Sequence, residues 1–244
     1  MVLSLDSAGH RGRIVALSRR GLVPRGHADF EAAPLELDEL PAGDALALWR
    51  WLRKRSAEVG FRAGLDSLRP HSHALWQSLS LKQQRRFLRH ARPWWDVHRH
   101  RIAPQVAQRL VELIGEGRLE VVAGRIVSMR ARDDGMMNVA IRRRATDIIL
   151  ESRFGFAFNC TGPLGAIDRT RDPLLKQLLD GGVARADALG IGLEVDGSSR
   201  AGDALWALGP MTKGRYWEIV AVPDIRGQAE GVAGEIVGEQ GSRS

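Results

Sequence analysis

Residues 12–21, GRIVALSRRG, place an uninterrupted apolar run directly before a basic turn. Ile14 to Leu17 has the length and composition of a short strand buried on both faces of a parallel sheet. Just upstream, Val2 to Leu5 has the pattern of a helix end, closed at Gly9. A helix that leads into a buried strand is the second half of a βαβ unit. The stretch therefore predicts an α/β fold, with the basic turn at the carboxyl end of a parallel strand.

The composition is that of a globular protein. The chain has 244 residues, of which 44% are apolar and 27% charged, so it is long enough to bury a substantial core. The only cysteine, Cys160, excludes an intrachain disulfide and a zinc site built from several cysteines. The sequence shows no secretion signal and no apolar run long enough to span a membrane. We therefore expect a cytoplasmic protein without membrane contact.

One segment supplies the whole basic excess behind the net charge of +7. Between Pro41 and Arg118 the chain has 15 Lys/Arg against 6 Asp/Glu, with five of the seven tryptophans and five of the seven histidines. Basic residues interleaved with tryptophan are typical of surfaces that follow a phosphate backbone and stack on bases. Here the charges are spread around helices rather than gathered on one reading element. A nucleic-acid-binding module is therefore the second-ranked interpretation.

Hydrophobic periodicity divides the chain into four segments. Residues 1–34 carry the predicted helix end and buried strand, and residues 35–118 have helical spacing, with Ser80 as a predicted N-cap. Residues 119–162 alternate with a period of two and predict a β-meander that feeds a buried strand. Residues 163–244 form the last segment.

In the last segment we expect a short helix at 172–179, two strands and one long helix. The strands are predicted at 190–195 and 204–208, and the second one ends at Gly209-Pro210. The helix is predicted to run from about Trp217 to Val237, with a kink or a delayed start at Pro223 because proline lacks the N–H that a helix interior needs.

The basic turn after the first strand has residues suited to a phosphate. At the end of the second strand of a dinucleotide fold, an acid selects the free ribose hydroxyls, whereas Ser and Arg accept a 2′-phosphate. Ser18, Arg19 and Arg20 fit the second case, since no acid is present. An ordinary basic turn is the competing interpretation of these three residues.

Two further strand ends carry small or polar residues at the predicted sheet edge. The apolar run FAFNC ends in Thr161-Gly162-Pro163, where backbone could approach a ligand. Gly209-Pro210 is followed by Trp217-Glu218 at the start of the predicted helix, whose free N–H groups favour an anion or a polarised ring oxygen. Ordinary tight turns are the competing interpretation.

Four stretches together resemble one family. They are VLSLDSAGHRGRIVALSRRGLVP (2–24), RPWWDVHRHRIAP (92–104), NCTGP (159–163) and GRYWEIVAVPDIRGQA (214–229). The chain resembles the C-terminal half of bacterial FAD-NAD(P)-binding proteins, which are related to flavin-containing monooxygenases and thioredoxin reductases. The resemblance implies a partial two-dinucleotide-binding, Rossmann-like flavoprotein with a helical insertion and a β-meander. It also implies an oxidoreductase that passes hydride from NADPH to FAD.

The resemblance assigns roles to individual residues. Ser18, Arg19 and Arg20 would line the pocket for the 2′-phosphate of NADPH. Thr161 and Gly162, followed by Pro163, match a crossover between the nicotinamide and flavin domains. Gly209 would approach FAD, with Pro210 in the place of the family's acid, and the helix beginning at Trp217-Glu218 would point at the isoalloxazine. The small-molecule substrate stays unassigned, and no side chain is named as a general acid or base.

One required motif is missing from the sequence. Pyrophosphate binding needs Gly-x-Gly-x-x-Gly between a strand and a helix, and this spacing does not occur in the 244 residues. We therefore expect a fragment that retains FAD and NADPH poorly, or a non-catalytic remnant of a flavoenzyme. A metal site at Asp96, His98 and His100 is the weaker interpretation of that cluster, because a single His-x-His pair is more often structural.

Overall fold

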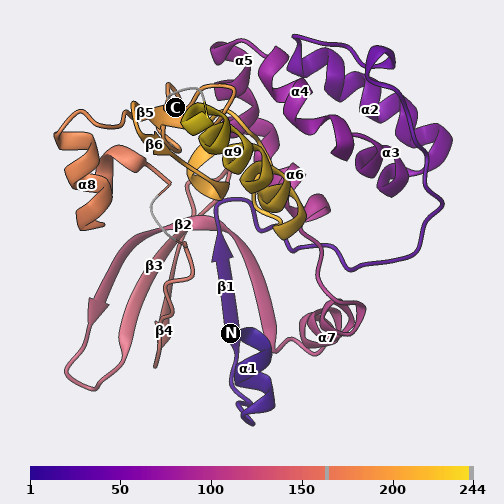
Figure 1. The fold of residues 1–244 in the computed structure, drawn as a ribbon. Coiled ribbons are helices and arrows are strands. Elements are labelled where there is room, and N and C mark those ends of the chain that lie inside the picture. The colour runs from indigo at the N-terminus through magenta and orange to yellow at the C-terminus, as the bar shows by residue number, and fades with distance from the viewer. Residues whose placement is uncertain (163–164, 242–244) are drawn as a thin grey trace. The chain divides into compact units, whose positions relative to one another are not determined.

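A four-stranded sheet has the first strand of the chain at one edge. β1 (Ile14–Ser18) pairs in parallel with β2 (Leu119–Ala131), and β3 (Met137–Arg143) and β4 (Ile149–Phe154) continue it as an antiparallel meander in the order β1-β2-β3-β4 (Figure 1). This is a computed structural model that describes residues 1–162 and 165–241. The predicted α/β class, parallel strand and β-meander are confirmed. The partial, Rossmann-like two-dinucleotide-binding fold stays a prediction.

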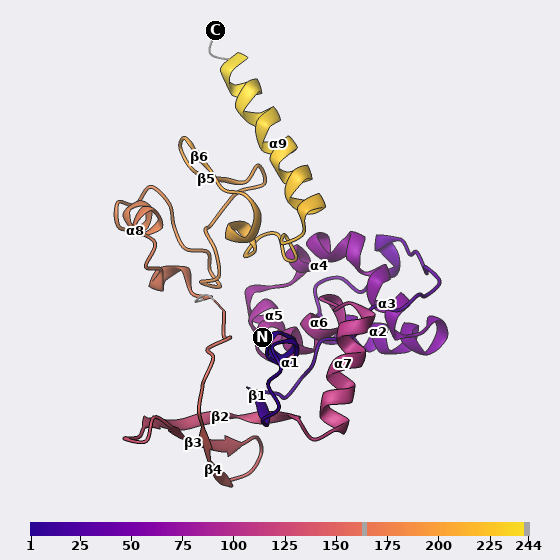
Figure 2. The ribbon, with the colours of Figure 1, turned by 90° about the horizontal axis from the view of Figure 1, so that it is seen from below.

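Two compact units make up the chain. Unit 1 comprises Met1–Glu31 and Leu88–Cys160, and unit 2 comprises Ala32–Phe87 and Thr161–Ser244. The helices of unit 1 are α1 (Val2–Ser7), α6 (Arg92–Arg99) and α7 (Pro104–Gly115). A π-helical turn, Phe87–Ala91, joins the two units. Figure 2 shows α1 and α7 on the same side of the unit 1 sheet.

Unit 2 consists mainly of helices. Its α-helices are α2 (Ala45–Val59), α3 (Phe61–Ser67), α4 (Ser72–Ser78), α5 (Leu81–Arg86), α8 (Pro173–Asp180) and α9 (Val222–Gly241). Among its described residues, 3₁₀ turns lie at Leu37–Glu39, Arg69–His71, Ile167–Arg169 and Gly209–Thr212, and short strands are β5 (Arg200–Gly202) and β6 (Leu205–Trp206). The predicted N-cap Ser80 is confirmed, because its Oγ accepts the Gln83 N–H at 3.4 Å. Side-chain caps of this kind satisfy N–H groups that the first helical turn leaves unpaired.

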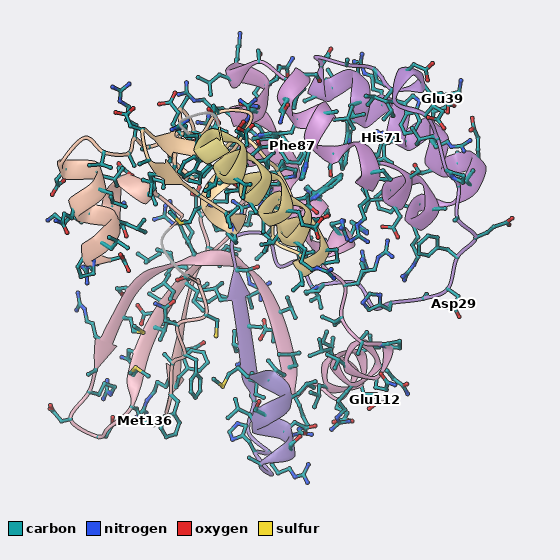
Figure 3. All side chains as sticks on the ribbon, viewed as in Figure 1. Asp29, Glu39, His71, Phe87, Glu112 and Met136 are labelled. Carbon is teal, nitrogen blue, oxygen red and sulfur yellow. The ribbon has the colours of Figure 1, made fainter. Side chains whose placement is uncertain are left out.

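An ion-pair cluster fixes α1 against α7 in unit 1. Asp6 of α1 accepts from Arg109 Nε at 2.8 Å and pairs with Arg118 Nη1 at 2.9 Å. Arg109 also donates to Glu112, which Figure 3 labels on α7, at 2.9 Å. Hydrogen bonding to Arg109 lowers the pKa of Asp6 from its usual 3.8 to about 2. These contacts hold α1, the helix that precedes β1, against α7.

The last third of the chain corrects three predictions. The predicted strand at 190–195 is wrong: the backbone there makes only an isolated bridge between Ala186 and Leu193. The predicted strand at 204–208 shrinks to Leu205–Trp206. The long helix begins at Val222 rather than Trp217, because Pro223 is tolerated in a first helical turn but not in an interior.

The strand predicted to lead into Thr161 is also wrong beyond Phe154. β4 ends there, and the following residues have no strand pairing, with Phe156 81% exposed. The apolar pattern continued past the end of the meander, but no neighbouring strand continues with it. Periodicity alone cannot show whether a partner strand is present.

Candidate anion-binding site

A basic pocket of about 480 Å³ lies at the carboxyl end of β1 in unit 1. It is formed by the residue after β1, by paired positions of β2 and β3, and by the loop between β3 and β4. The lining residues are Arg19, Gly124, Arg125, Arg142, Arg143, Arg144, Ala145, Thr146 and Asp147. Five arginines against one aspartate give the pocket a positive potential that attracts anions.

Two of these arginines lie at directly paired positions. Arg125 of β2 and Arg142 of β3 are register partners in the antiparallel ladder. Side chains at paired positions leave the same face of a sheet with their Cβ atoms about 5 Å apart. Among the described residues, neither guanidinium has a hydrogen-bond or ion-pair partner, and the Nε of the half-buried Arg142 is itself buried. The pair is therefore an uncompensated positive site.

The acidic side chain of Glu120 on β2 is engaged by arginines other than Arg125 and Arg142. Glu120 of β2 pairs with Arg13 and accepts from Arg143 Nη2 at 3.1 Å. Its charge is thus shared by two guanidinium groups outside the Arg125–Arg142 pair. This distribution leaves the pocket with an excess of positive charge.

Backbone contacts hold the wall and rim of the pocket in place. The Arg144 N–H donates to the Ala123 carbonyl at 2.9 Å, and Thr146 Oγ1 accepts from the Ile148 N–H at 3.3 Å. Ala145 is in the left-handed region at φ 58°, which tightens the turn. At Gly124 a Cβ would lie 2.5 Å from the Arg142 carbonyl oxygen, so only glycine allows this close approach of the two strands.

The three residues predicted to bind a 2′-phosphate make different contacts in the structure, and only one of them lines the pocket. Arg19 lines the pocket. Ser18 Oγ accepts the Gly21 N–H at 2.9 Å and so closes the turn after β1. Arg20 donates to the Arg89 carbonyl at 3.0 Å and is not part of the pocket lining.

Sequence reasoning missed Arg125 and Arg142. The signal was present in the two alternating runs around the turn at Asp133 to Gly135, since a register between them places GRI (124–126) opposite IRR (141–143). The register itself depends on a bulge in β2 between Ile126 and Ser128. A bulge shifts the pairing by one residue, and the local alternation of apolar residues does not predict where a bulge lies.

The residues of the predicted crossover lie outside any strand. Thr161 and Gly162 are exposed, and Gly162 has a φ of +75° that favours glycine. Pro163 lies outside the described residues.

The residues predicted to approach FAD are engaged within unit 2. The Gly209 N–H donates to Gln228 Oε1 at 2.7 Å, and Pro210 lies in the first turn of the 3₁₀ segment that follows. Trp217 is buried and stacks on Trp76 at 4.9 Å between ring centroids. Gly209 and Trp217 are thus engaged in contacts within unit 2, and their approach to FAD stays a prediction.

Phe87 and the remaining FAD candidate, Glu218, lie next to Trp217 in space and in sequence, respectively. Phe87, labelled in Figure 3, meets Trp217 edge to face at 5.4 Å. Glu218 adopts a left-handed φ of +73° in the turn before α9 rather than a helical conformation. The predicted helix N-terminus at Trp217-Glu218 is therefore absent, since α9 begins at Val222.

Within the tract from Asp96 to His100, the carboxylate of Asp96 is engaged in an ion pair. Asp96 accepts from Arg92 Nε at 3.3 Å, and burial raises the pKa of this carboxyl. The parts of the chain that the structure describes hold no group of three or more His, Cys, Asp or Glu side chains placed to bind a metal ion. Over the same residues, no helix has the length and apolarity needed to cross a bilayer.

No protein-family model, curated protein or solved structure matches this chain.

Proposed function

We propose that the chain contacts the phosphate on the adenosine ribose of NADPH, as part of the flavin-dependent oxidoreduction that its sequence resemblance implies. Because the glycine motif for the pyrophosphate is missing, this contact supplies the specificity half of the site, and the chain holds the whole cofactor weakly. The observation that carries the proposal is the placement of Arg19 in an arginine-lined pocket at the carboxyl end of a parallel strand. Ligands of open α/β sheets bind outside the carboxyl ends of their strands. The pocket thus lies where a dinucleotide fold would hold this phosphate.

The residue types also favour a phosphorylated ribose over a free one. Free ribose hydroxyls are bound by a carboxylate at this strand end, whereas a phosphate is bound by guanidinium groups through paired, charge-assisted hydrogen bonds. The turn after β1 has Arg19 and no acid. The only acid in the pocket lining is Asp147, on the loop between β3 and β4.

In this proposal the chain's own residues bind and orient the nucleotide. Arg19 holds the adenosine end, which fixes one end of an extended dinucleotide and limits where the other end can lie. The hydride chemistry belongs to the cofactor when it is bound. Flavin contacts are not assigned to residues, because Gly209 and Trp217 are engaged in the packing of unit 2.

Binding measurements on the full chain test the proposal. Adenosine 2′,5′-bisphosphate and adenosine 5′-monophosphate differ only in the 2′-phosphate, and we expect the bisphosphate to bind at least about tenfold more tightly by isothermal titration calorimetry. Arg19→Ala should lower bisphosphate affinity by about tenfold or more, since hydrogen bonds to charged groups contribute about 1.5–3 kcal/mol.

Arg20→Ala is the matched control. Its guanidinium donates to the Arg89 carbonyl instead of lining the pocket, so we expect bisphosphate affinity within about twofold of the unmodified chain, allowing for loss of a distant charge. Equal affinity for the two nucleotides, or equal losses in both variants, would contradict the proposal.

A further inference from the structure

We propose that the Arg125–Arg142 pair is the principal phosphate-binding element of the pocket and that it selects a phosphate monoester dianion over a diester. The inference rests on the proposed function for the identity of the nucleotide, but not for the chemistry of the anion. The sequence resemblance assigns no role to either arginine.

The first argument is the pairing of like charges. Opposite-charge pairs stabilise directly paired sheet positions and like charges destabilise them. Arg125 and Arg142 occupy such positions, and among the described residues no acidic side chain pairs with either of them. A bound dianion placed between the two guanidinium groups removes this repulsion. The gain from binding is therefore larger here than at an isolated surface arginine.

The second argument is the burial of Arg142. Its Nε has lost contact with water and has no acceptor among the described residues. An unsatisfied donor on a charged group is costly, and an oxyanion that bonds the guanidinium offsets that cost. Arg142 is thus the pocket residue that gains most from a phosphate.

The third argument is the balance of charge. The pocket lining has five arginines and one aspartate, and Glu120 neutralises Arg143 only in part, because it also pairs with Arg13. An excess of more than one positive charge remains. A phosphate monoester carries about −1.5 to −2 at pH 7, whereas a diester carries a single negative charge. The monoester therefore matches the pocket better.

The shape of the pocket separates this ligand from a nucleic acid. A single-stranded nucleic acid needs a basic groove along several nucleotides, with aromatic side chains for its bases. The lining of this pocket gathers its arginines in one concave site of about 480 Å³ and includes no aromatic residue. The backbone of a nucleic acid is also a chain of diesters, which the pair does not favour.

A matched pair of ligands tests the selectivity. Adenosine 2′-monophosphate is a monoester, and adenosine 2′,3′-cyclic monophosphate is a diester with the same base and sugar. In calorimetric titrations of the full chain we expect the monoester to bind at least about tenfold more tightly. Arg142→Gln and Arg125→Gln should each reduce that ratio to about twofold or less.

Arg130→Gln is the control variant. Arg130 lies on the same strand as Arg125 but opposite Asn138, and it is not part of the pocket lining. We expect it to keep the preference for the monoester. Thermal unfolding without ligand checks folding: the two pocket variants should melt at or above the temperature of the unmodified chain, because each removes a like-charge contact.

Three results would overturn the inference. They are equal affinity of the unmodified chain for monoester and diester, an equal loss of preference in Arg130→Gln, and tighter binding of single-stranded DNA than of the monoester. The proposed function fails separately. If the pair selects the monoester but NADPH binds no better than NADH, the inference stands and the NADPH assignment falls. If a preference for NADPH survives Arg142→Gln but not Arg19→Ala, the NADPH assignment stands and the inference about the pair falls.

Discussion

Arg125 and Arg142 lie directly opposite each other across β2 and β3, and no acidic side chain of the described residues pairs with either guanidinium. A sheet gains nothing from this arrangement in the absence of a ligand, because like charges at paired positions are destabilising. Functional sites often retain such local costs, which the rest of the fold offsets. The pair is therefore the part of unit 1 where stability and binding are expected to oppose each other.

The repulsion should be visible in the salt dependence of unfolding. Arg142→Gln should raise the free energy of unfolding by about 0.5 kcal/mol at low ionic strength, the middle of the range for such pairs. The difference should shrink at high salt, since the Debye length falls from about 30 Å at 0.01 M to about 3 Å at 1 M. Urea unfolding at several chloride concentrations measures this, with Arg130→Gln as the control. A destabilised Arg142→Gln at every salt concentration would argue against repulsion.

Acid should weaken the docking of α1 on α7. The pKa of Asp6 is lowered from 3.8 to about 2 by Arg109 and Arg118, so the carboxylate contributes stability above about pH 4. That contribution is lost as the pH falls from about 4 to about 2. Asp6→Asn should therefore be less stable at pH 6 and lose less stability over this interval than the unmodified chain.

Asp29→Asn is the control for the acid experiment. Asp29, labelled in Figure 3, is an exposed aspartate of unit 1. The stability of Asp29→Asn should therefore change with pH as that of the unmodified chain does. Circular dichroism during urea unfolding, repeated across the pH range, gives the measurement. Parallel profiles for Asp6→Asn and the unmodified chain would rule out the ion-pair contribution.

Gln228 should be a stability determinant of unit 2. Its Oε1 accepts the Gly209 N–H at 2.7 Å, and its Nε2 lies 2.9 Å from Thr212 Oγ1. Gln228→Ala leaves the buried Gly209 N–H without this acceptor, and we expect a loss of about 1–3 kcal/mol. Glu230→Ala, an exposed position on the same helix, should change stability by about 0.5 kcal/mol or less. Similar losses in both variants would show that the destabilisation comes from substitution in α9 as such, and not from loss of the Gln228 hydrogen bonds.

Trp217 should act through packing. It is buried and contacts the rings of Trp76 and Phe87. Trp217→Ala should lower the free energy of unfolding by about 3–5 kcal/mol, as large-to-small core substitutions do, and should reduce the near-ultraviolet dichroism of the stacked indoles. Trp94→Ala, at a position that is 40% exposed, should do neither. If Trp217→Ala kept the stability of the unmodified chain, packing would not explain this residue, and a ligand contact would be the better interpretation.

The sequence by itself determined the local elements of unit 1. The apolar run of β1 and the alternating runs of the meander each decide their conformation within a few residues, so periodicity located them. Beyond Phe154 and around 190–195, the same apolar signals produced no strand, because a strand also needs a neighbour to pair with. The start of α9 at Val222 was set by Pro223, whose effect the sequence indicated only as a kink or a delay.

Only the tertiary structure decided which residues make the site. The sequence placed Ser18, Arg19 and Arg20 together because they are adjacent, but the turn after β1 sends Arg20 to the Arg89 carbonyl and leaves Arg19 in the pocket. Arg125 and Arg142 are distant in sequence and meet through a register that includes a bulge. Local propensity acts over a few residues, whereas a pocket is formed by contacts between strands. The sequence therefore determined the strand end and its charge, and the register between strands decided which charges meet.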